Sequence, residues 1–97
     1  MIARFLQLAQ QEIVEAVEFY EKRAEGLGAE FYSELAKSMN DIEAHPELWG
    51  AVSDHYRRKL LSRFPFGIIY RVHEDDILIV AVAHTSRKPK YWMKRES

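Results

Sequence analysis

The spacing of apolar residues changes several times along the chain, and each change predicts a different element. Residues 2–8 have the character of a short strand. Residues 9–25 carry apolar side chains at intervals of three and four, which is typical of an amphipathic helix. Gly26-Leu27-Gly28 interrupts the pattern, and Gly26 is expected as the C′ residue of that helix. Residues 29–44 carry a second helical stripe, so an antiparallel helical hairpin is expected.

Three further strands are expected in the C-terminal half. They follow a loop over residues 45–54, in which we expect Trp49 to pack over one end of the core. Residues 56–63 and 66–73 alternate as strands do. Residues 77–83 are apolar on both faces, which favours an interior strand covered on both sides.

The predicted element order is β-α-α-β-β-β. This order indicates an α+β fold, in which an N-terminal strand and an antiparallel helical hairpin pack with a small sheet. The last three strands are expected to form an antiparallel meander. With 97 residues, the chain is expected to form a single domain over residues 1–97.

Composition narrows the possible functions. The chain has no cysteine, which excludes disulfides and thiolate metal sites. Its longest apolar run, residues 77–83, is far too short to cross a bilayer, so a cytoplasmic protein without a membrane partner is expected. No histidine lies at metal-ligand spacing, and we expect neither a metal nor a cofactor.

The formal net charge of -1 conceals an asymmetry. Residues 1–54 hold four basic and eleven acidic residues, a balance of -7, whereas residues 55–97 hold ten basic and four acidic residues, a balance of +6. The basic half could meet a polyanion or an acidic protein, or the two halves could neutralise each other within the fold. We expect the glutamates of the first helix to form a solvated face: Glu12, Glu15, Glu18 and Glu21.

Basic residues concentrate on the strand expected over residues 56–63. Alternation places Arg57, Lys59 and Arg63 on one face, where three cations could contact phosphate or stabilise a phosphorane. The alternative is a solvated strand edge, where cations discourage pairing with another sheet. The other candidates for binding are Arg58, Arg71, Arg87, Lys88 and Trp92.

His84 follows the most apolar strand and could act as a general base or acid in RNA cleavage, with Tyr91 as a further catalytic candidate. The alternative is a histidine that caps the strand by bonding a backbone carbonyl or the Thr85 hydroxyl. Taken alone, the residues favour this structural role. Tyr91 and Trp92 could stack on bases, or they could pin the C-terminal segment onto the sheet, and we favour the packing role for Trp92.

Three segments, together with the element order and the acidic first helix, resemble the RelE/ParE superfamily of bacterial type II toxin–antitoxin toxins, often labelled plasmid stabilisation proteins. The resemblance covers nearly the whole chain. The segments are Arg57-Arg58-Lys59-Leu60, Phe64-Pro65-Phe66-Gly67-Ile68-Ile69-Tyr70 and Ala81-Val82-Ala83-His84-Thr85-Ser86-Arg87-Lys88-Pro89-Lys90-Tyr91-Trp92.

The resemblance implies two classes of function. RelE-like members are mRNA interferases that cleave mRNA on the ribosome, and Arg57 and Lys59 match their basic strand residues. Tyr91 or Trp92 lies near their C-terminal tyrosine, and Arg87 near a later basic residue. ParE-like members instead poison DNA gyrase.

Gly67 stands where RelE-like members carry an arginine, which tilts the interpretation toward gyrase inhibition. A histidine placed like His84 occurs in other ribonuclease branches and in ParE-like members. The expected partners are a cognate antitoxin and either gyrase or the ribosome with its mRNA; a homodimer stays open. A degenerate module that binds antitoxin without toxicity is a third alternative.

Overall fold

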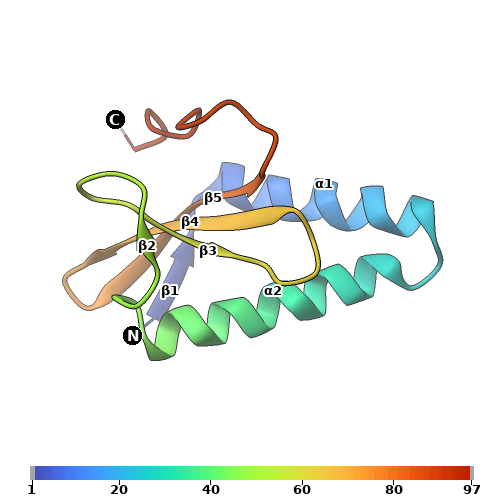
Figure 1. Ribbon diagram of the computed structural model, residues 1–97, viewed down its shortest axis with the longest axis horizontal. Coiled ribbons are helices and arrows are strands. Elements are labelled where there is room, and N and C mark those ends of the chain that lie inside the picture. Colours follow the sequence, from blue (N-terminus) through green and yellow to red (C-terminus); the bar gives the residue numbers. More distant parts are fainter. Residues whose placement is uncertain (1, 97) are drawn as a thin grey trace.

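In the computed structural model, which describes residues 2–96, two helices pack against one face of a five-stranded sheet (Figure 1). The helices are α1 (Gln7–Arg23) and α2 (Leu27–Ala44). The strands are β1 (Ile2–Phe5), β2 (Gly50–Ala51), β3 (Arg57–Leu60), β4 (Phe66–His73) and β5 (Asp76–His84). None of the described helices is long and apolar enough to cross a membrane.

The strand order is β1-β5-β4-β3-β2, with β1 parallel to β5 and every other neighbouring pair antiparallel. The α+β prediction is confirmed, and so is the interior position of the last strand, which lies between β1 and β4. The strand β2 was not predicted. It adds two residues to the sheet edge within the expected loop, pairing Gly50 with Arg58.

Apolar residues fill both faces of the sheet, which explains why β5 is apolar on both of its faces. On the helix face, Phe31 and Ile42 of α2 pack with Ile68, Tyr70 and other buried residues. On the opposite face, the C-terminal tail (residues 85–96, red in Figure 1) lies across the sheet. There Trp92 is only 4% exposed and meets Tyr56 at a ring-centroid distance of 4.8 Å, so Trp92 pins the tail as expected.

Several predicted boundaries were wrong, because local contacts end an element earlier than periodicity suggests. The strand expected over residues 2–8 stops at Phe5, since the Leu6 carbonyl already accepts the first helical hydrogen bond, from Gln10. The strand expected over residues 56–63 covers only Arg57–Leu60. Beyond it, the Ser62 N–H donates to Glu34 on α2, and the chain turns inward.

The break at Gly26-Leu27-Gly28 is confirmed, but α2 begins at Leu27 rather than at residue 29, and Gly26 is its N-cap. Gly26 has a φ of 86°, a left-handed conformation that glycine adopts at little cost. The Glu21 carboxylate accepts hydrogen bonds from the N–H groups of Gly26 and Gly28, each at 3.0 Å. A Cβ at Gly28 would lie 2.7 Å from the Val17 carbonyl oxygen, so this position permits the close approach of the two helices.

Candidate functional site

The two faces of β3 carry different cations. Arg57 and Lys59 are paired with Tyr70 and Ile68 of β4, both of which belong to the helix-side core. Arg58 is paired with Ile69, which belongs to the tail-side cluster. Since residues directly opposite in an antiparallel ladder share a face, Arg57 and Lys59 lie on the helix side and Arg58 lies on the tail side.

Arg57 and Lys59 both contact Trp49. The Arg57 guanidinium donates a 2.7 Å hydrogen bond to the Trp49 carbonyl, and the Lys59 ammonium lies 4.4 Å from the centroid of the indole ring. Trp49 packs on the helix-side core, as predicted. Two of the cations expected to hold phosphate therefore bind Trp49, in the loop before β2. The third, Arg63, lies beyond the end of β3 and pairs with Glu30 at 2.8 Å, so the expectation of three cations on one strand face was wrong.

A shallow hollow of about 290 Å³ lies between the end of β5, the middle of the sheet and the tail. We call it the tail hollow. Its lining includes His84, Gly67 and Tyr91, together with four cations that we call the cationic rim: Arg58, Arg87, Lys88 and Lys90. A Cβ built on Gly67 would lie 3.0 Å from Cγ and Cδ of Arg58, so the absence of a side chain at Gly67 lets the Arg58 stem cross the sheet toward the hollow.

His84 reaches the tail hollow with one ring nitrogen already bonded. Its Nδ1 accepts a 3.0 Å hydrogen bond from the Ser86 backbone N–H and lies 2.8 Å from the Ser86 hydroxyl. Since a backbone N–H can only donate, the neutral ring carries its proton on Nε2. The partner is thus Ser86, where a carbonyl or the Thr85 hydroxyl was expected. In this tautomer, Nε2 is a hydrogen-bond donor and cannot accept the proton of an attacking hydroxyl.

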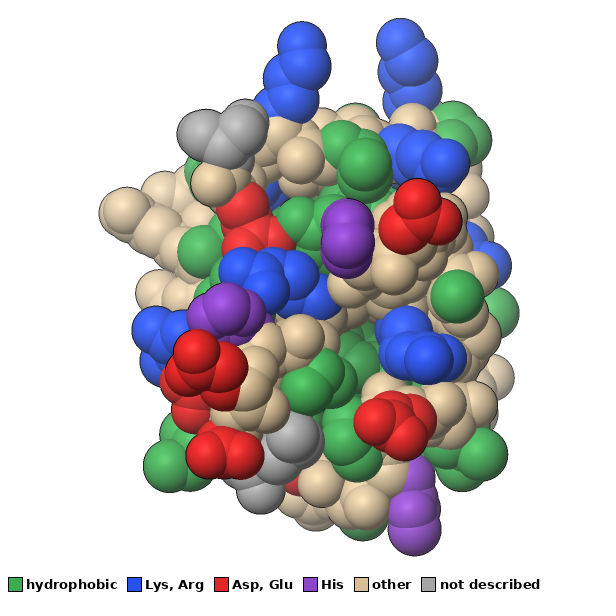
Figure 2. All heavy atoms as spheres, turned by 90° about the vertical axis from the view of Figure 1, so that its left-hand side faces the viewer, with side chains coloured by type: hydrophobic (Ala, Val, Ile, Leu, Met, Phe, Trp, Pro, Cys, Tyr) green, Lys and Arg blue, Asp and Glu red, His purple; other side chains and the backbone are tan. Residues whose placement is uncertain are grey.

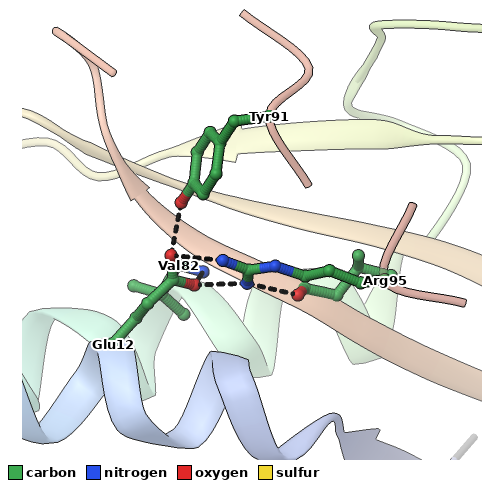
Figure 3. A network of polar contacts seen from close by, with 5 residues as sticks. Glu12, Val82, Tyr91 and Arg95 are labelled. Atoms are coloured by element: carbon green, nitrogen blue, oxygen red, sulfur yellow. Dashed lines mark hydrogen bonds and ion pairs between the residues drawn. The ribbon is translucent and has the colours of Figure 1, made fainter. Parts of the chain in front are cut away.

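Tyr91 is held by a network that reaches across the fold (Figure 3). Its hydroxyl donates to Glu12 of α1, and the Arg95 guanidinium binds the same carboxylate at 2.8 and 2.9 Å. Two backbone groups of β5 complete the network. The Val82 N–H donates to Glu12 at 2.9 Å, and the Val80 carbonyl accepts a hydrogen bond from Arg95 at 3.0 Å. The network satisfies backbone groups of β5 beyond the end of β1.

Glu12 was expected on a solvated helix face, and that expectation was wrong. The Glu12 and Arg95 side chains are each 12% exposed. The periodicity of α1 could not reveal this role, because the partners of Glu12 lie 70 or more positions away along the chain.

Burial, reinforced by the bond to Glu12, raises the pKa of Tyr91 from 10.0 to about 12. The unfolded chain therefore loses this proton at a lower pH than the folded protein, and stability should fall as pH rises from 10 to 12. Burial also raises the pKa values of Tyr20, Tyr56 and Tyr70. We predict that Tyr91→Phe loses less free energy of unfolding than the wild type as the pH rises from 10 to 12. Urea unfolding at a series of pH values measures this loss. An equal loss in both proteins would contradict the role assigned to Tyr91.

Arg71 is neutralised by the tail. It binds the Glu96 carboxylate through Nε at 2.8 and 2.9 Å and through Nη2 at 2.7 Å, and the Tyr56 hydroxyl donates to the same group. The hydrogen bond from Arg71 lowers the pKa of Glu96. These residues border a hollow of about 610 Å³, and Figure 2 looks onto that end of the molecule, where acidic, basic and histidine side chains are interspersed.

The contacts divide the predicted binding residues into two groups. Arg63 and Arg71 each pair with a glutamate, and Trp92 is buried. Within residues 2–96, Arg58, Lys88 and Lys90 form no ion pair. Arg87 lies over the Tyr91 ring, 3.9 Å from its centroid.

The tail hollow thus holds His84 and Tyr91 with the cationic rim, while Arg57 and Lys59 lie elsewhere. Among the described residues, no group of acidic or histidine side chains could hold a metal ion.

Comparison with known proteins identifies a matching family model and a solved structure with a similar fold. A family model described as the ParE toxin of the type II toxin-antitoxin system, parDE, matches residues 3–89. A solved structure described as the chromosomal ParDE TA system from P. aeruginosa matches with a TM-score of 0.74 and 15% sequence identity. The match covers 87% of this chain and 95% of that one. At 15% identity, it shows that the two chains share a fold and no more. No curated protein matches the chain.

Proposed function

The chain belongs to the ParE toxin family of type II toxin–antitoxin systems, and from this premise we propose that it inhibits growth by binding DNA gyrase without chemistry of its own. We further propose that it acts in the cytoplasm and that a cognate antitoxin neutralises it. The observation that carries the proposal is the separation of the groups that RNA cleavage would need. Arg57 and Lys59 bind the Trp49 loop, whereas His84 and Tyr91 lie at the tail hollow.

The bonding of His84 and Tyr91 supports the same conclusion. A general base needs a free acceptor nitrogen within reach of the substrate hydroxyl, but Nδ1 of His84 is bonded to Ser86. A proton donor needs a pKa near the working pH, but the pKa of Tyr91 is raised to about 12 and its hydroxyl is bonded to Glu12. A toxin that acts by binding requires neither group to be free.

The proposal predicts that ATP-dependent supercoiling of relaxed plasmid by purified gyrase falls as the chain is added. Premixing the chain with the purified product of the neighbouring antitoxin gene should restore supercoiling. The chain's own heat-denatured sample serves as the control for nonspecific effects. Full supercoiling at saturating folded protein would reject gyrase as the target.

A second candidate is ribosome-dependent cleavage of mRNA. The observation that favours it is the cationic rim beside His84, which could contact RNA phosphate. Mapping of mRNA 5′ ends in a purified translation system tests it, because new ends that require both ribosomes and the chain would establish cleavage. If neither supercoiling nor mRNA is affected, the chain is the degenerate module that binds antitoxin without toxicity.

A further inference from the structure

The cationic rim gathers, around one hollow, cations that form no ion pair among the described residues. Arg4, Arg63, Arg71 and Arg95 each form an ion pair with a carboxylate. The described contacts give Arg58, Lys88 and Lys90 no such pair, although all three border the same hollow of about 290 Å³. Like charges gathered without counter-charges repel one another, and an anionic ligand would relieve that repulsion.

The surroundings fix two members of the rim. The Arg58 stem lies across Gly67, and the Arg87 guanidinium lies over the Tyr91 ring, which Glu12 and Arg95 hold in place. Lys90 adopts a φ of 62°, a left-handed backbone conformation that is unfavourable for lysine. A cation at a position suited to glycine is consistent with a binding role for its side chain.

We propose that the tail hollow binds the sugar–phosphate backbone of duplex DNA through the cationic rim. This inference rests on the proposed function, because DNA is the substrate of gyrase, and it adds a direct contact between the toxin and the DNA that the enzyme holds. Four cations suit such a contact, since phosphate binding depends on charge and carries no sequence information.

The aromatic residues of the hollow favour duplex DNA over single-stranded RNA. Recognition of a single strand uses exposed rings on which unpaired bases stack. Trp92 is 4% exposed and packs on Tyr56, and the Tyr91 ring is covered by Arg87. The hollow therefore offers charge without a free stacking platform, which suits a duplex whose bases are already paired.

Fluorescence anisotropy with a short labelled DNA duplex tests this site without gyrase. We expect K88Q/K90Q to bind about tenfold more weakly than the wild type, and the slope of log affinity against log salt to fall by about two. The matched control is K22Q/K37Q, which removes two exposed lysines from the helices and should change affinity less than about twofold. Equal losses in both variants, absence of duplex binding, or tighter binding of a single-stranded RNA of equal length would overturn the proposal.

Failure of the DNA site can be distinguished from failure of the proposed gyrase inhibition. If the wild type inhibits supercoiling but does not bind the duplex, the DNA site is wrong and gyrase inhibition stands. If it binds the duplex through the cationic rim but leaves supercoiling intact, the site stands and the gyrase proposal fails. Near-ultraviolet circular dichroism of both double variants should match the wild type, which establishes that any loss of binding is not a loss of folding.

Discussion

Replacing Glu12 with glutamine is expected to destabilise the fold by about 3 kcal/mol, because it leaves the Arg95 guanidinium buried without its counter-charge. The Tyr91 hydroxyl and the Val82 N–H also lose a charged acceptor. The expected loss lies at the low end for a broken buried ion pair, because both side chains keep 12% of their surface exposed to water. Urea unfolding measures the change.

The control for Glu12 is Glu15→Gln on the same helix. Glu15 is exposed, so this change should alter the free energy of unfolding by less than about 0.5 kcal/mol. A double-mutant cycle with Arg95→Met isolates the pair, and the double variant should lose less than the sum of the two single losses. If Glu12→Gln unfolds at the same urea concentration as the wild type, the network does not hold the tail.

Replacing Phe31 with alanine is expected to cost about 4 kcal/mol, since a fully buried ring is lost and a cavity remains. The Phe31 ring stacks on Tyr20 at 5.4 Å and meets Phe64 and Phe66 edge-on at 5.2 and 5.0 Å. It therefore joins both helices to the turn between β3 and β4. Thermal or urea unfolding gives the loss.

Tyr32, the next residue, provides the control for Phe31. It is 58% exposed, and Tyr32→Ala should change stability by less than about 0.5 kcal/mol. If Phe31→Ala does not fold, Phe31→Leu keeps most of the apolar volume and should lose about 1 kcal/mol. A wild-type unfolding midpoint for either Phe31 variant would contradict the packing described for α2.

Local sequence patterns predicted the elements that are determined by residues close together in the chain. The two helices follow from the period of their apolar positions, β4 from its alternation and β5 from its continuous apolar run, and the break at Gly26 follows from its conformational freedom. The strand β2 has only two residues and exists because Gly50 pairs with Arg58 across a loop. No periodicity can be detected over so short a segment.

The candidate site was harder to predict because it depends on contacts between distant residues. The sequence indicated a basic strand, but not that Arg57 and Lys59 would bind Trp49 while Arg58 reaches the tail hollow. The neutralisation of Arg71 depends on Glu96, 25 residues later. From the sequence, Gly67 indicates only the loss of a cation, whereas the structure places the stem of Arg58 across it.

Supercoiling by purified gyrase, titrated with the wild-type chain and with His84→Ala, tests the central claim most directly. If the toxin acts by binding, both proteins should inhibit supercoiling and neither should create new mRNA 5′ ends, since the ring of His84 performs no chemistry. Unimpaired supercoiling at saturating wild-type protein, together with new mRNA 5′ ends that vanish with His84→Ala, would contradict the account and identify His84 as a catalytic residue.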